Sequence, residues 1–179
     1  MHLFHVPPAA SGWALVLHGG AGGRVEELSL EEAGGYAEGL TAAYLAGAAV
    51  LAAGGSALDA VCATVERLED DPLFNAGRGA ALTAGGTAEL DACVMTGDGR
   101  AGAIAACRHA RNPVHAARKV MEETPAVLLI APTRARLTGW DLADWLDDRG
   151  RGPFTSRRQE QPAVRDQGPT IVEPSPRPS

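Results

Sequence analysis

The sequence LEDDPLFNAGRG (residues 68–79) decides how the surrounding chain must be organised. Pro72 has no backbone N–H and clashes with a helix, so the helical pattern before it must end by Asp71. Gly77 and Gly79 can adopt positive φ, which permits a tight turn against other backbone after Asn75. Residues 68–79 are therefore predicted to form an irregular loop at the end of a helix.

Three acidic residues crowd the predicted helix C-terminus, where the macrodipole disfavours negative charge: Glu69, Asp70 and Asp71. A cation held by backbone carbonyls of the loop would compensate this charge. A solvated acidic turn explains the same residues equally simply. The residues alone leave both interpretations open.

Two helices are predicted before the loop. Residues 30–53 are rich in alanine and leucine, Gly54-Gly55 ends that helix, and Ser56 is placed to cap the next one. Apolar residues then recur with the spacing of one helix face, which we expect to pack on a sheet: Leu58, Val61, Cys62, Val65 and Leu68.

The segment nearest the start is predicted to be a buried strand, residues 13–17, that enters the turn His18-Gly19-Gly20. Glycine amides there could approach an anion or a ligand closely. A tight turn at the strand end explains the same residues, and His18 is then a hydrogen-bonded structural residue.

After the loop, residues 80–83 and 87–96 are predicted to form a β-hairpin, and a turn at 97–99 leads into a strand at 101–107. Asn112 is expected to cap a helix that has Pro113 at its first position and ends near Glu123. A buried strand at 126–130 and a short amphipathic helix within 134–151 are expected to follow.

Composition limits the class of protein. The chain has 179 residues, 45% of them hydrophobic, and a formal charge of −6, which disfavours a nucleic-acid binder or a basic membrane surface. Residues 1–151 suit one domain, whereas residues 152–179 carry six of the twelve prolines and are expected to be a mobile tail. No signal peptide or spanning segment is evident, so the protein is expected to be cytoplasmic.

Three cysteines without a CxxC pair are expected to be reduced and buried, with a catalytic thiol as the alternative: Cys62, Cys93 and Cys107.

Several motifs, in one order, resemble the plant-type L-asparaginases, also called isoaspartyl peptidases, of the N-terminal-nucleophile hydrolases. Besides the loop, they are HGGAG at 18–22, GGSALDAV at 54–61, ELDACVM at 89–95, RNPV at 111–114 and AARKVM at 116–121. The resemblance is close over residues 15–130 and loose over 154–172. It implies an α+β fold, the αββα sandwich of N-terminal-nucleophile hydrolases, of which this chain would be the α-subunit half.

The resemblance also implies site residues. Asn75 matches the family asparagine beside the nucleophile, although a turn-capping amide explains it too. His18, Gly19 and Gly20 match the glycine loop near the cleavage site. The resemblance implies a structural sodium ion, no organic cofactor, and sodium ligation by the backbone carbonyls of Leu68, Glu69, Asp71, Phe74, Ala76 and Arg78.

Family members cleave themselves to expose a threonine, whose hydroxyl is the nucleophile and whose α-amine is the base. The Gly-Thr-Val-Gly segment that this threonine opens does not occur in the sequence. Thr87 falls in the predicted hairpin, and only nine residues follow Thr170. The nucleophile is therefore expected on a β subunit that the chain does not include.

We therefore expect an α subunit or truncated precursor, inactive alone, that with a β subunit forms an (αβ)2 heterotetramer. The implied reaction is hydrolysis of L-asparagine or β-aspartyl (isoaspartyl) dipeptides. A non-catalytic, α-like remnant that binds a partner is the alternative from another class. A glycosylasparaginase is a third interpretation, disfavoured by the lack of an evident secretion signal.

Overall fold

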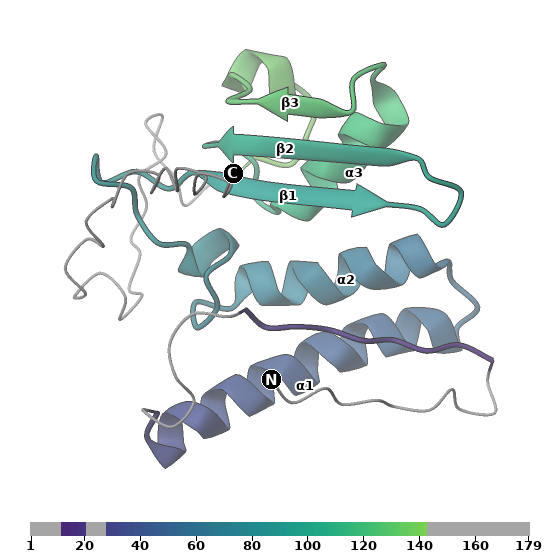
Figure 1. The fold of residues 1–179 in the computed structure, drawn as a ribbon, viewed down its shortest axis with the longest axis vertical. Helices are drawn as coiled ribbons and strands as arrows, with labels where there is room; N and C mark the ends of the chain where they lie inside the picture. Colours follow the sequence, from purple (N-terminus) through teal and green to yellow (C-terminus); the bar gives the residue numbers. More distant parts are fainter. Residues whose placement is uncertain (1–11, 21–27, 143–179) are drawn as a thin grey trace, which may run out of the picture.

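The computed structural model describes residues 12–20 and 28–142. Two long helices lie side by side, and a three-stranded sheet with a third helix behind it stands beside them (Figure 1). The elements are α1 (Leu30–Ala52), α2 (Ala57–Asp70), β1 (Leu90–Met95), β2 (Ala101–Cys107), α3 (Pro113–Glu123) and β3 (Leu128–Ile130), with short 3-10 turns η2 (Gly77–Gly79) and η3 (Arg134–Leu137).

Side-chain caps fix where the two long helices begin. Ser29 and Glu32 form a capping box at the start of α1, in which the Glu32 N–H donates to Ser29 Oγ over 3.2 Å. Ser56 Oγ accepts from the Asp59 N–H over 3.1 Å, which confirms the predicted cap of α2. Gly54, at φ +81°, carries the chain out of α1.

Gly47 brings α1 and α2 close together. A Cβ at this position would lie 2.1 Å from Thr64 Oγ1 and 2.9 Å from the Ala60 carbonyl oxygen, both on α2. Gly47 has a low intrinsic helix propensity, but its lack of a side chain permits the close contact between α1 and α2.

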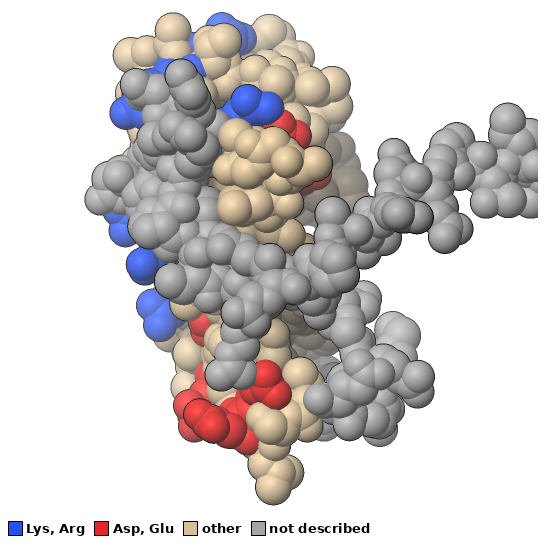
Figure 2. Space-filling model, turned by 90° about the vertical axis from the view of Figure 1, so that its left-hand side faces the viewer, with Lys and Arg blue, Asp and Glu red and all other residues tan. Residues whose placement is uncertain are grey.

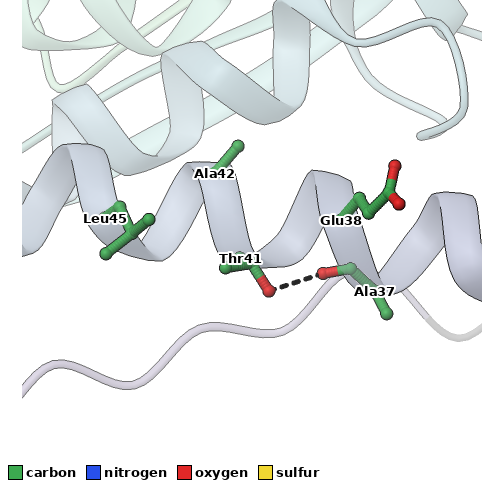
Figure 3. Close-up of a pocket in the computed structure, with 5 residues that line it drawn as sticks. All are labelled: Ala37, Glu38, Thr41, Ala42 and Leu45. Carbon is green, nitrogen blue, oxygen red and sulfur yellow. Dashed lines mark hydrogen bonds between the residues drawn. The ribbon is translucent and has the colours of Figure 1, made fainter.

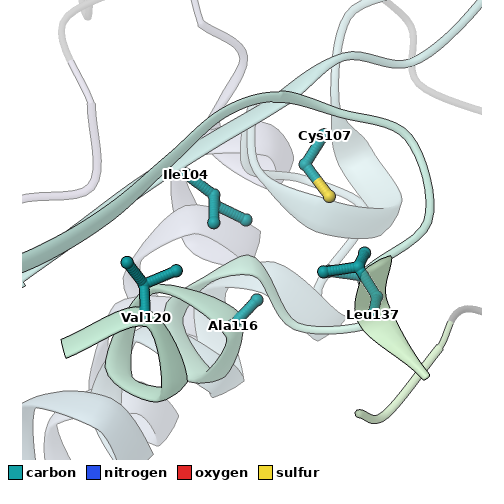
Figure 4. Close-up of a cluster of buried hydrophobic side chains, with 6 residues drawn as sticks. Ile104, Cys107, Ala116, Val120 and Leu137 are labelled. Atoms are coloured by element: carbon teal, nitrogen blue, oxygen red, sulfur yellow. The ribbon is translucent and has the colours of Figure 1, made fainter. Parts of the chain in front are cut away.

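The sheet has the order β1-β2-β3, with β1 and β2 antiparallel and β2 and β3 parallel. The turn between β1 and β2 and the bounds of β2 are as predicted. Helix α3 connects β2 to β3 and packs on one face of the sheet, where the main core lies (Figure 4). That core contains Ile104, Cys107, Ala110, Ala116, Val120 and Leu137.

The predicted strand at residues 13–17 is wrong. The segment is extended, with Leu15 buried and Val16 exposed, but it pairs with no strand among the described residues. It runs along the helices instead (Figure 1), where Leu15 reaches Gly47 and Leu17 packs against the cluster of Ala43, Leu68 and Phe74.

The predicted hairpin at 80–96 is shorter than expected. Leu82 and Ala88 form one isolated antiparallel bridge, supported by the Thr83 N–H donating to the Thr87 carbonyl over 2.8 Å. From Leu90 onward the chain pairs with β2 instead.

Four further expectations need correction. Asn112 precedes α3 but its side chain does not cap that helix, and Val61 on α2 is 39% exposed rather than part of a buried face.

Strand β3 lies at the sheet edge with Leu128 and Ile130 exposed, because no described strand covers it. Over 134–142 the chain forms the 3-10 turn η3 and one bridge from Leu142 to Ala110, so no α-helix begins there as predicted. The rest of that helix and the proline-rich tail lie outside the described residues.

Helices and sheet together confirm the α+β class. The described residues form one sheet, so the αββα sandwich and the α-subunit half stay predictions. Within the described part of the chain, no helix has the length and apolar character required to cross a membrane.

Candidate functional site

The loop after α2 begins as the sequence predicts. Helix α2 ends at Asp70, and Asp71 is extended before Pro72. The Leu73 N–H donates to Asp71 Oδ1 over 2.9 Å, which closes a local turn. Phe74 then turns inward, is buried, and meets Tyr36 of α1 edge-on with ring centroids 5.7 Å apart.

Backbone oxygens converge on two glycines of this loop. A Cβ on Gly77, at φ +48°, would lie 2.3 Å from the Glu69 carbonyl oxygen. A Cβ on Gly79 would lie 2.1 Å from the Phe74 carbonyl oxygen and 2.6 Å from that of Pro72. Only glycine allows the backbone to come this close to the carbonyls.

The loop carbonyls retain lone pairs that a cation can use. The Asp71, Phe74 and Ala76 carbonyls each accept one backbone N–H, and every carbonyl oxygen has a second lone pair. Oxygen ligands are those that hard cations prefer. Leu68, Glu69, Asp71, Phe74, Ala76 and Arg78 therefore stay the predicted sodium ligands.

The electrostatic argument for a cation is corrected by the structure, because the acids have protein partners. Glu69 is 3% exposed, and its Oε1 accepts from the Val114 N–H over 2.9 Å at the start of α3. Asp70 Oδ1 accepts from Asn112 Nδ2 over 3.3 Å. The C-terminal acids of α2 thus lie at the N-terminus of α3, where the helix dipole favours negative charge.

Burial raises the pKa of Glu69 to about 8, while the Val114 N–H opposes the shift. Its carboxyl is therefore largely uncharged near neutral pH and adds little negative charge to the end of α2. Its second oxygen, Oε2, is buried and has no hydrogen-bond partner among the described residues.

No local pattern indicates this role of Glu69, because Val114 is 45 residues further along the chain. The same interface between α2 and α3 continues with His115 Nε2, 2.9 Å from Glu66 Oε2, and with Arg118 Nη1, which donates to Asp59 Oδ1 over 2.6 Å. Hydrogen bonds from Ser56 and then Arg118 hold the pKa of Asp59 below its usual value.

Asn75 is exposed on the loop, and its Oδ1 accepts from the Ala81 N–H over 2.8 Å. This contact is what a turn-capping amide makes. The predicted position beside a nucleophile stays a prediction.

The glycine turn and the loop are brought together. The Gly20 N–H donates to His18 Nδ1 over 3.0 Å, so His18 makes the local hydrogen bond expected of a structural residue. Gly19 lies against Leu40 and Phe74, since a Cβ there would be 2.8 Å from Leu40 Cδ2 and 3.1 Å from Phe74 Cε1. Two predicted site segments, far apart in the sequence, thus meet at Phe74.

One surface hollow lies elsewhere. It has a volume of about 360 Å³ and is lined by Ala37, Glu38, Thr41, Ala42 and Leu45 of α1 (Figure 3). The Thr41 hydroxyl donates to the Ala37 carbonyl over 2.7 Å, so the polar group next to Glu38 is already occupied within the helix. Glu38 and Thr41 are the polar side chains of this hollow, and its other lining residues are apolar.

Figure 2 shows acidic side chains gathered near the lower end of one face, and lysine and arginine above them with a few acidic atoms among them. The first turn of α1 carries Glu31 and Glu32, where negative charge complements the helix dipole.

Comparison with known proteins defines the class to which this fold and loop belong. Residues 11–139 match the family Asparaginase_2, described as asparaginase. The chain belongs to this asparaginase family.

Individual relatives agree. The chain is 50% identical over 118 residues to a protein named isoaspartyl peptidase from Escherichia coli (strain K12), a match that covers 65% of this chain and 37% of the relative. It is 44% identical over 152 residues to a plant-type L-asparaginase from Thermococcus kodakarensis, covering 83% and 46% respectively. It is 47% identical over 116 residues to an isoaspartyl peptidase/L-asparaginase from Xenopus laevis, covering 64% and 36%. The matched regions span less than half the length of these curated relatives.

Proposed function

We propose that this chain is the α part of a threonine amidohydrolase that acts on L-asparagine, β-aspartyl (isoaspartyl) dipeptides or both. A β half, in the same polypeptide or a separate one, would supply the nucleophilic threonine, and the assembly would be the (αβ)2 heterotetramer. The names of the relatives support the reaction class. The observation that carries the proposal is the contact between the glycine turn and the Asn75 loop at Phe74.

In the proposed reaction, the threonine hydroxyl attacks the side-chain amide carbonyl of the substrate, and the α-amine of the same threonine removes the proton. Ammonia, or the amine of the dipeptide, leaves, and water then resolves the acyl-enzyme. Asn75 would stand beside the nucleophile at the edge of the loop. Hydrogen-bond donors aimed at the developing oxyanion would stabilise the tetrahedral intermediate.

The outer face of the sheet supports a partner of this kind. Leu128 lies next to Ala103, which pairs with Cys93, so the three side chains share the face that α3 does not cover. The large side chains at the two ends of this face, Met95 opposite Ala101 and Ile130 opposite Ala105, are 72% and 69% exposed. Apolar residues in one such patch mark a surface for another protein element, and a second sheet from the β half is the occupant we propose.

Co-expression tests the proposal. A coding segment with Gly-Thr-Val-Gly, downstream in frame or in a neighbouring gene, identifies the β half. We expect the two halves to co-purify and the pair to release ammonia from L-asparagine or amino acids from isoaspartyl dipeptides. A stable pair with no activity on either substrate favours the non-catalytic remnant instead.

A further inference from the structure

Glu69 belongs to α2, yet its side chain accepts a hydrogen bond from the first turn of α3. The Val114 N–H, at the second position of α3, donates to Glu69 Oε1 over 2.9 Å. Backbone N–H groups in the first turn of a helix have no partner within that helix. Asn112 leaves this N–H free, because its own side chain binds Asp70.

The backbone of the same residue touches the loop. A Cβ on Gly77 would lie 2.3 Å from the Glu69 carbonyl oxygen and 2.8 Å from Glu69 Cβ. One buried residue therefore joins α3, through its side chain, to the loop, through its backbone.

We propose that Glu69 is a positioning residue, whose hydrogen bond to α3 holds its own carbonyl and the adjoining Gly77 backbone in the geometry that binds the ion. This inference rests on the proposed function where it concerns sodium. A ligand held from outside the loop loses less freedom when the ion binds, so the site is preorganised.

The neighbouring acids do not share this role. Asp71 binds Leu73 within the loop itself, and Glu66 meets His115 one turn earlier on α2 with a side chain that is 42% exposed. Glu66 lies on the same interface between α2 and α3, so it provides a matched control.

Three variants separate positioning from general stability. Glu69→Gln keeps an oxygen that can accept from Val114. Glu69→Met keeps the approximate volume but has no such acceptor, so the Val114 N–H loses its partner and some loss of Tm is expected. Glu66→Met makes the same substitution one turn earlier on α2, at a residue that binds His115.

Two readouts are measured on the complete chain, alone and with the β half. One is hydrogen exchange of the amides of residues 71–79, and the other is the rise in Tm caused by sodium relative to potassium. We expect Glu69→Met to accelerate exchange at residues 71–79 more than in the rest of the chain, and to weaken sodium binding by about 10-fold or more, as loss of an outer ligand partner does. Glu69→Gln and Glu66→Met should keep both readouts close to those of the unchanged chain.

The inference is overturned if Glu69→Met leaves loop exchange and sodium affinity unchanged. It is also overturned if Glu69→Gln accelerates loop exchange and weakens sodium binding as much as Glu69→Met does. If the unchanged chain shows no response to sodium, the predicted ion site fails. The hydrogen-exchange rates of residues 71–79 in Glu69→Met and Glu66→Met then still decide whether Glu69 positions the loop. Equal rates in the two variants overturn that role.

Discussion

Asn75 has two possible tasks that differ in the atoms they use. Holding the loop needs only its Oδ1, which accepts from the Ala81 N–H. Assisting a nucleophile as an amide would also use its NH₂ group as a donor. Asparagine and aspartate share the oxygen acceptor and differ in the donor, so the two tasks can be separated by substitution.

We predict that Asn75→Asp keeps the loop but loses activity. In the assembled protein, Asn75→Asp should leave hydrogen exchange at Ala81 as in the unchanged chain, while kcat falls about 10²-fold if an amide donor stabilises the transition state. Asn75→Ala should lose both, because it has no acceptor. Full activity in Asn75→Asp would show that Asn75 only caps the loop.

Asp71 is predicted to contribute its backbone carbonyl, and not its carboxylate, to the sodium site. Asp71→Asn keeps both the carbonyl and a side-chain oxygen for the Leu73 N–H. Sodium affinity, measured from the sodium-dependent rise in Tm, should therefore change less than about threefold, a difference below 1 kcal/mol. A large loss of affinity would place the carboxylate in the ion's coordination shell.

Two of the four glycines in helix α1 have different surroundings. Gly47 faces α2, where a Cβ would collide with Thr64 and with the Ala60 carbonyl. Gly34 also lies within α1, but a Cβ there would meet nothing within 4 Å.

Alanine at these two positions should therefore change stability in opposite directions. We expect Gly47→Ala to lower the free energy of unfolding by about 1–3 kcal/mol through overpacking. Gly34→Ala should raise it by about 0.5–1 kcal/mol, because glycine is a poor helix former. Urea unfolding of the two variants provides the measurement, and equal effects at both sites would contradict the close contact between α1 and α2.

Features governed by neighbouring residues could be predicted from the sequence. Ser56 as a cap, Pro72 as the end of α2 and the turn before β2 all follow from local backbone chemistry. Asn112 could not be assigned correctly, because the acceptor that serves α3 comes from Glu69. Residues 13–17 form the short apolar run of a buried strand, but hydrogen bonding in a sheet needs a partner strand that such a run cannot reveal.

The same limit applies to the candidate site. The loop and its glycines are evident in the sequence, since Pro72 and Gly77 impose their own backbone geometry. The contact of Gly19 with Phe74 depends on how α1 packs, and no local pattern encodes it.

A cysteine on the exposed sheet face can report whether a partner covers that face. Cys62 and Cys107 are buried as expected, but Cys93 on β1 is exposed, so the expectation of three buried cysteines is wrong for Cys93. Burial raises the pKa of the Cys62 thiol. Reactivity requires an accessible thiolate.

We predict that iodoacetamide modifies Cys93 rapidly in the chain alone, and Cys62 and Cys107 only after unfolding. In the complex with the β half, Cys93 should become protected by at least about 10-fold, because docking of a second sheet removes it from solvent. Peptide mass spectrometry identifies the modified cysteine. Equal labelling of Cys93 in both states would place the partner elsewhere.

Ammonia release from L-asparagine, with isoaspartyl dipeptide hydrolysis measured in parallel, tests the proposed function most directly. It compares the purified 179-residue chain, the chain assembled with its β half, and the same assembly with the β-half threonine changed to alanine. We predict activity only in the assembly that keeps its threonine, and none above the buffer blank in the other two samples. Hydrolysis by the purified chain, or by the alanine variant, would contradict the assignment of this chain as an α part that depends on a threonine outside it.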